Sequence, residues 1–273
     1  MGEGAKGEKP GEDIRLSGLR VAAHIEYTAA AVQAQAQLKI FGLKESLMNY
    51  LTGTGFAATE VRNNRVTVLA GDEGGVMSTV YKGAIWRSYA DYSGAPEVSL
   101  NVHCLGSYYD TVKPYPSRSY KGAVDVATIL AEIAQDIDLA FENDGVDVKL
   151  TDQHLKGTAM DQINQCVQAA NIAYTISCGK LIIFPQGKSR NAPVILVSPQ
   201  TGMVGYPAIS SQDLSIMSLY SPLFEIGRKV QIESDMMVAN GQWVISSIIH
   251  SLESEVPKGP WFSAIQCMRS IGE

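Results

Sequence analysis

The chain has 273 residues and a formal net charge of −6, with no long basic run. That balance argues against a protein whose task is to grip nucleic-acid phosphates, because such binding rests on clustered Lys and Arg. Charged residues make up 18% of the chain, below the roughly 25% of an average globular protein. A charge-poor surface suits a subunit that packs against neighbours, although ordinary β proteins share this composition.

The N-terminus and the apolar runs give no sign of a secretory or membrane segment. No stretch approaches the about 18 uninterrupted apolar residues of a membrane-spanning helix, so we expect no membrane insertion. The opening MGEGAKGEKPGED has no apolar signal-peptide core. Residues 1–12 are rich in Gly, Lys and Glu, and we predict that they are disordered in the free chain.

Residues 13–106 predict one β-barrel or sandwich with a single helix. Apolar side chains alternate along 14–27 and again along 32–40, as strands with one buried face require. The opposite face of the second strand is a polar row of Gln33, Gln35, Gln37 and Lys39. This row is either a solvent face or an amide-rich surface that meets another subunit. LKESLMNYLTG predicts a short helix, and two strands joined by a glycine turn (63–86) and one at 97–106 follow.

Residues 107–190 have the pattern of a small α/β domain. A connector with two prolines and several tyrosines precedes a helix predicted over 124–140 by its helical apolar spacing. A strand, DGVDVKL, follows. Thr158 and Asp161 resemble a capping box that opens a second helix. A hairpin turns at Cys178-Gly179, where glycine permits a positive φ.

Residues 191–273 predict strands and turns alone. Five strand candidates are PVILVSP, LSIMSLYSP, RKVQIES, QWVISSIIHSLES and WFSAIQCMRS. No sequence repeat relates them to the first β region.

The sequence contains no nucleophile motif, P-loop, HExxH or dinucleotide-binding glycine pattern. We therefore expect no catalytic, cofactor or metal site. The acidic candidates for a hydrolase are Asp72, Glu73, Asp136, Asp138, Glu253 and Glu255. Spacing along a chain cannot show that two of them converge across a cleft, and acids in turns are usually solvated.

Histidines, cysteines and tyrosines are scattered through the chain. His24, His103, His154 and His250 are better explained as core or interface residues than as ligands, because zinc needs three or four converging groups. Cys104, Cys166, Cys178 and Cys267 form no CxxC pair, and we expect free thiols in a reducing compartment. Tyr108, Tyr109, Tyr115 and Tyr120 either stack on sugars, line a partner groove or pack on their own domains.

Three groups of segments carry a resemblance to a known family. The first is 124–163 (VDVATILAEIAQDIDLAF onward) with 170–187, and the second is 198–234 (SPQTGMVGYPAISS onward) with 240–267. The N-terminal segments IRLSGLRVAAHIEY, FGLKESLMNYLT and GVMSTVYKGAIW fit as well. Together they resemble the baseplate hub proteins of contractile-tailed bacteriophages over nearly the whole chain. Each motif is less specific than a catalytic signature. The resemblance rests on the order of the motifs and on the large part of the chain that they cover.

The resemblance implies an α+β fold, mainly β, in which two tube-like β-barrel domains (13–106 and 191–273) flank a small α/β domain (107–190). It implies a non-enzymatic homotrimer, whose pseudo-sixfold ring joins the hexameric tail tube to the trimeric spike. DNA would pass through the channel without specific binding. The tail tube and tail spike proteins are the implied partners, with baseplate wedge and tape measure proteins as further candidates. The implied location is the virion tail baseplate, after assembly in the host cytoplasm.

Two other classes of function remain open from the sequence. A cell-wall hydrolase on a tail tip would need carboxylates facing each other in a cleft. A monomeric tail-tip module that binds carbohydrate or a receptor would need exposed aromatic side chains in a groove.

Overall fold

The computed structural model describes residues 14–29, 33–52, 64–72, 74–210 and 213–269. It is mainly β, with 48% strand and 16% helix, which confirms the predicted fold class. The segment 1–12, predicted to be disordered, lies outside the described residues. None of the described helices has the length and apolar character that crossing a bilayer would require.

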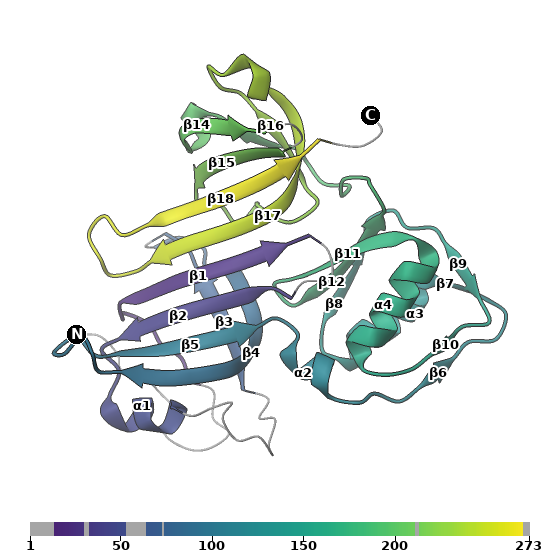
Figure 1. The fold of residues 1–273 in the computed structure, drawn as a ribbon, viewed down its shortest axis with the longest axis horizontal. Coiled ribbons are helices and arrows are strands. Elements are labelled where there is room, and N and C mark those ends of the chain that lie inside the picture. The colour runs from purple at the N-terminus through teal and green to yellow at the C-terminus, as the bar shows by residue number, and fades with distance from the viewer. Residues whose placement is uncertain (1–13, 30–32, 53–63, 73, 211–212, 270–273) are drawn as a thin grey trace.

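A single large sheet contains strands from both β regions (Figure 1). The first β region supplies β1 (Val21–Thr28), β2 (Gln35–Phe41), β3 (Arg65–Ala70), β4 (Ser78–Asp91) and β5 (Ser99–Leu105). The second β region supplies β13 (Ile195–Val197), β14 (Met203–Ile209), β15 (Asp213–Leu219), β16 (Lys229–Ile232), β17 (Gly241–Glu253) and β18 (Trp261–Met268). The main path runs β14-β15-β18-β17-β1-β2-β5-β4-β3, while β16 pairs with β17 and β13.

The two β regions meet where β1 pairs antiparallel with β17, from Ala22 opposite Glu253 to Thr28 opposite Ser247. Side chains from both regions pack into one hydrophobic core, in which Ile25 and Ile248 are almost fully buried. The boundaries at residues 106 and 190 divide the chain into three sequence segments. In space, however, the first and second β regions share one sheet and one hydrophobic core.

The middle segment forms a separate α/β domain with its own core. Its elements are α2 (Tyr108–Val112), β6 (Arg118–Ser119), β7 (Ala123–Asp125), α3 (Val126–Asp136), β8 (Ala140–Asn143), β9 (Lys149–Thr151), β10 (His154–Leu155), α4 (Ala159–Ala170), β11 (Ile172–Ser177) and β12 (Lys180–Pro185). The order of its main sheet is β11-β12-β8, with β8 parallel to β12. Helices α3 and α4 lie beside this sheet (Figure 1). The remaining elements of the chain are α1 (Glu45–Leu51), η1 (Pro199–Thr201) and η2 (Met237–Ala239).

Several local predictions are confirmed. The alternation in β2 buries Ala36, Leu38 and Ile40 and exposes Gln35, Gln37 and Lys39. The capping box at Thr158 is present, with Asp161 in the position that usually holds Glu. The hairpin turns at Cys178 and Gly179, with φ angles of 51° and 80°.

Other predicted elements have different limits. The helix expected over 124–140 is α3 alone, because Val124 belongs to β7 and Ala140 begins β8. Asp138, at φ 59°, turns the chain out of the helix. The strand expected from residue 14 begins only at Val21, after Gly18 adopts a positive φ. The sequence reading missed β8 and β14, and also the short elements α2, β6, β7 and β10.

Candidate functional site

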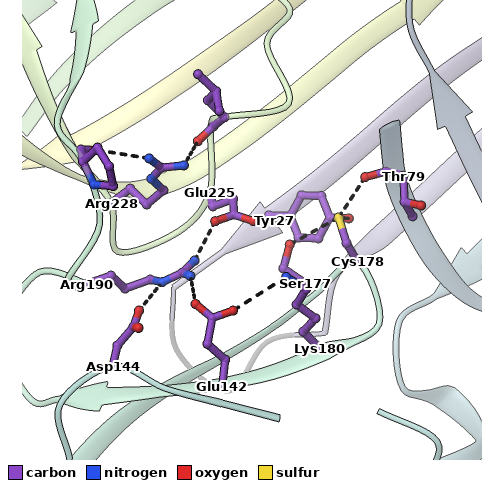
Figure 2. Close-up of polar contacts among 12 residues, drawn as sticks. Tyr27, Thr79, Glu142, Asp144, Ser177, Cys178, Lys180, Arg190, Glu225 and Arg228 are labelled. Carbon is purple, nitrogen blue, oxygen red and sulfur yellow. Dashed lines mark hydrogen bonds and ion pairs between the residues drawn. The ribbon is translucent and has the colours of Figure 1, made fainter. Parts of the chain in front are cut away.

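The junction between the α/β domain and the large sheet is built around Arg190. Its side chain is only 4% exposed, and it contacts three carboxylates (Figure 2). The Arg190 Nε donates to Asp144 Oδ2 at 2.7 Å, Nη2 donates to Glu142 Oε1 at 2.7 Å, and Nη1 donates to Glu225 Oε2 at 2.8 Å. Glu142 lies in β8 and Asp144 just after it, whereas Glu225 belongs to the second β region. The Arg190 guanidinium therefore links the α/β domain to the second β region.

Electrostatics explain why this cation remains charged. Burial by itself would lower the pKa of Arg190, but the hydrogen bond that it donates to Asp144 and the charges of Glu225, Asp144 and Glu142 raise it above its ordinary value. Charge-assisted hydrogen bonds of this kind are stronger than neutral ones. A buried charge that lost these partners would be costly, so the contact fixes the position of the α/β domain.

Backbone packing at the junction depends on Gly227. Its φ of 80° disfavours other residues, and a Cβ there would lie 3.1 Å from the Arg190 Cγ and 3.2 Å from the Phe184 Cζ. The Arg190 backbone N–H donates to the Gly227 carbonyl at 2.8 Å. Next to it, the Arg228 guanidinium donates to the carbonyls of Leu223 and Pro193, both at 3.0 Å.

The tip of the β11–β12 hairpin makes a second contact, with the first β region. The Cys178 Sγ donates to the Thr79 carbonyl at 3.2 Å, beside the Tyr27 hydroxyl (Figure 2). That hydroxyl donates to the Val80 carbonyl at 2.6 Å, and desolvation by burial raises the pKa of Tyr27 well above its ordinary value. The α/β domain therefore has polar contacts with both β regions, and a change in its position would break them.

The outer face of the sheet carries mainly neutral polar side chains across its middle strands, with Glu26 on β1 and Lys39 on β2 as charged residues. Gln37 on β2 lies opposite His24 on β1 and His103 on β5, and His24 lies opposite Ser251 on β17. The next row joins Gln35, Glu26 and Ile249. These side chains project from the face opposite the core, since their strand neighbours are buried. The polar row predicted along 33–39 is therefore part of a wider surface shared by both β regions.

The acidic candidates do not converge in the described part of the chain. Asp136 pairs with Arg118, Asp138 with Arg65 at 2.5 Å, and Glu253 with Arg20 at 3.0 Å. Asp72 and Glu255 are exposed in loops, and Glu73 lies outside the described residues. Asp136, Asp138 and Glu253 each pair with an arginine and not with a second carboxylate across a cleft. These observations do not support the paired carboxylates of a hydrolase.

The four histidines lie on four different strands. His250 is buried on the inner face of β17 with its Nδ1 2.9 Å from the Ser263 hydroxyl, and burial lowers its pKa to about 4. His103 stacks on Tyr89 on the outer face. His24 is exposed, as is His154, whose Nδ1 contacts Ser119. Among the described residues, no three His, Cys, Asp or Glu side chains come together as metal ligands would.

All four cysteines are free thiols in the structure. Burial raises the pKa of Cys104 and Cys267 to about 12 and that of Cys166 to about 11. These three thiols are therefore core side chains with little nucleophilic character. Cys178 is partly exposed at the hairpin tip and has the structural contacts given above.

Two of the connector tyrosines, Tyr115 and Tyr120, contact their own domain. Tyr120 donates its hydroxyl to Glu132 at 2.6 Å, and Arg118 lies over the Tyr115 ring at 5.8 Å. Both contacts are within the α/β domain. The side chains of Tyr108 and Tyr109 lie outside what the structure describes.

The sequence reading missed Arg190, and no local pattern marks it. Its three partners lie 46, 48 and 35 residues away in sequence. An isolated Arg between Ser189 and Asn191 has the appearance of a solvated loop residue. Only the fold brings these charges together.

Three solved structures share this architecture. A tail protein from Neisseria meningitidis aligns with a TM-score of 0.63 at 9% identity, covering 91% of each chain. A 43 kDa tail protein of prophage MuSo2 from Shewanella oneidensis gives 0.63 at 12% identity, covering 96% of this chain and 95% of that one. An E. coli component of the type VI secretion system, described as similar to the T4 tail proteins gp27 and gp5, gives 0.63 at 10% identity, covering 95% of this chain and 77% of that one. Likenesses at such low identity establish the fold.

The family is established by sequence. Residues 7–262 match the family described as baseplate hub gp41. The chain belongs to this family and is a structural component of the phage tail baseplate. No curated protein matches it in sequence.

Proposed function

We propose that three copies of this chain form the hub ring of the baseplate, which joins the hexameric tail tube to the trimeric spike. The observation that carries the proposal is the pairing of β1 with β17. It places the two β regions side by side in one sheet, so that one chain offers two adjacent docking units. Three such chains offer six, which meets the symmetry of a six-subunit tube while keeping that of a three-chain spike.

The charge-poor outer face supports a channel for DNA. Gln35, Gln37 and Ser251 present neutral polar groups there, while Glu26 adds a negative charge and Lys39 a positive one. A wall without clustered cations does not hold phosphates, so DNA slides past it without specific binding. The α/β domain, fixed through Arg190, lies outside the ring, where wedge or tape measure proteins have access to it. The chain itself acts by assembly and has no enzymatic role.

The copy number in assembled baseplates tests this proposal. A cryo-EM map of the isolated baseplate should contain three copies about the tail axis, with the first and second β regions in six similar positions. The two regions should also superpose on each other as related folds. A monomer or dimer in the assembled particle, or one β region far from the channel, contradicts the proposal.

A further inference from the structure

The α/β domain and the large sheet have separate hydrophobic cores. The core of the sheet draws on both β regions, and that of the α/β domain draws on residues between 115 and 183. Among the buried apolar side chains of the described residues, only Ala84, Ile182 and Phe184 belong to neither core. We call the contact surface between the two units, where these three residues lie, the seam. Apolar burial in the seam is therefore small beside that in either core.

Two small cavities lie in the seam. One, of about 20 Å³, is lined by Tyr27 and Gln33 of the first β region and by Thr175 of the α/β domain, among others. The other, of about 30 Å³, has Ala84 and Leu139 in its lining. Each has room for at least one water molecule. The Gln33 Oε1 is buried and has no hydrogen-bond partner among the described residues. Packing and hydrogen bonding in the seam are therefore less complete than in a protein core.

Ion pairs hold the two sides of the seam together. Arg190 contacts Glu225 at 2.8 Å and is buried. Asp138 contacts Arg65 at 2.5 Å and Lys82 at 4.0 Å, and its side chain is 75% exposed. Neither carboxylate belongs to a hydrophobic core. Neutralising these two acids should therefore weaken the seam and leave the packing of both cores unchanged.

The chain crosses the seam at two short connectors. Gly106 and Ser107 join β5 to α2, and residues 186–194 join β12 to β13. The second connector contains Gly187, which has a φ of 74°. In the described part of the chain, no strand of the α/β domain belongs to the large sheet. A rotation of the domain would therefore alter the connectors and the seam, as in a hinge motion, but not the pairing of the sheet.

We propose that the α/β domain undocks from the large sheet as a folded unit, and that the ion pairs of Glu225 and Asp138 hold the docked form. Domains whose contact is small and polar are the ones expected to move relative to each other. This inference goes beyond the proposed hub function and does not depend on it, because the shared sheet is the same in both forms. A partner that binds the α/β domain can then move it without dismantling the sheet.

The chain carries its own reporter of the docked form. Cys178 lies against β4, with its Sγ 3.2 Å from the Thr79 carbonyl. A Cβ on the neighbouring Gly179 would come within 2.8 Å of the Lys82 Cδ, so the hairpin tip packs closely there. The other three cysteines are at most 1% exposed: Cys104, Cys166 and Cys267. In the folded chain N-ethylmaleimide should therefore react with Cys178 alone, and faster when undocking uncovers it.

The double variant Glu225→Gln/Asp138→Asn tests the seam. Both replacements keep the size of the side chain, and asparagine tolerates the φ of 59° at position 138. As a control, Asp125→Asn/Glu132→Gln makes the same charge change in two ion pairs that lie within the α/β domain. Mass spectrometry counts the adducts and their rate of formation, and circular dichroism verifies folding.

The seam variant should react at Cys178 at least about tenfold faster than the unmodified chain, while the control matches it. Each chain should gain a single adduct. An unchanged rate in the seam variant, or an equal increase in the control, overturns the proposal. Reaction of all four cysteines together also overturns it, because that result reports unfolding of the cores. If Cys178 of the unmodified chain reacts as fast as in the urea-unfolded chain, the hairpin tip is not covered and no docked form protects it.

A second thiol separates undocking from fraying of the hairpin tip. Thr175 is 6% exposed and lines the first cavity, away from the tip of the hairpin. Thr175→Cys is added to the unmodified chain and to the seam variant, and peptide mapping follows each thiol. If the domain undocks as a unit, the thiols at 175 and 178 should both react faster in the seam variant, by the same factor. Faster reaction at Cys178 alone would show a local opening of the hairpin and contradict the proposal.

Discussion

Arg190 is the single side chain whose loss should destabilise the fold most clearly. Arg190→Ala leaves Glu142, Asp144 and Glu225 without their common cation, and removing one partner of a buried pair costs about 3–5 kcal/mol. We expect the lower end, about 3 kcal/mol, because the Glu142 side chain is 36% exposed. The midpoint of urea denaturation measures the change.

An exposed ion pair provides the control for Arg190. Lys149→Ala breaks the contact with Asp125, whose side chain is 53% exposed, and such pairs contribute at most about 1 kcal/mol. If both variants lost the same amount of stability, Arg190 would not be the residue that links the α/β domain to the large sheet.

His250 should make stability depend on pH. Burial lowers its pKa to about 4 in the folded chain, against about 6.5 when unfolded. The unfolded state therefore binds the extra proton first as the pH falls, and the folded state loses stability between about pH 6.5 and 4. A shift of this size corresponds to about 3 kcal/mol.

The variant His250→Gln isolates this effect, because glutamine does not titrate and can still contact the Ser263 hydroxyl. Between pH 7 and 4, its free energy of unfolding should fall by about 3 kcal/mol less than that of the unmodified chain. Carboxylates titrate in both proteins and cancel in the comparison. Parallel pH profiles in the two proteins would rule out His250 as the source.

At the scale of elements, the start of α4 depends on the Thr158 capping box. The Thr158 hydroxyl accepts from the Asp161 N–H at 3.1 Å, and Asp161 Oδ2 accepts from the Thr158 N–H at 2.9 Å. Thr158→Ala should cost about 1 kcal/mol, because one helix N–H loses its acceptor. Thr158→Ser keeps the hydroxyl and should be nearly neutral. Chemical denaturation compares the two, and a serine variant as unstable as the alanine variant would contradict this role.

Elements whose signals are local were predictable from sequence. The capping box spans four residues, and the alternation in β2 needs only seven. In contrast, β8 was missed because AFEN has four residues without a clear alternation, and its position depends on parallel pairing with β12. The strand β14 was missed because Gly205 and Pro207 interrupt its pattern. Pairings at long sequence separation, such as β1 with β17, leave no mark in a local window.

The candidate site, too, was predictable from sequence only where its signal is local. The polar face of β2 was visible as a row of amides, but its extension across His24 and Ser251 required the register of the assembled sheet. Exposed apolar side chains are even harder to recognise in the sequence. Val76, Tyr206 and Met237 have the same residue types as core positions, and only the fold shows that they are exposed.

At the scale of the whole molecule, the shared sheet and core predict that the two β regions unfold as one unit. Cooperative unfolding is expected where two segments cannot lose contact without exposing a common core. The tryptophans report on the two regions separately. Trp86 lies on β4, whereas Trp243 and Trp261 lie on β17 and β18.

Two variants allow each β region to be followed alone. In Trp243→Phe/Trp261→Phe, the remaining Trp86 reports on the first region, and in Trp86→Phe the other two tryptophans report on the second. Replacing Trp243, which is 3% exposed, lowers stability by itself, so the comparison is made within each variant. Fluorescence and circular dichroism, which follows the strands of both regions, should give the same urea midpoint. If the first region were an independent domain, Trp86 fluorescence would change at a midpoint different from that of the circular dichroism signal. We expect equal midpoints, because Ile25 and Tyr27 on β1 lose their packing in the shared core as soon as β17 leaves the sheet.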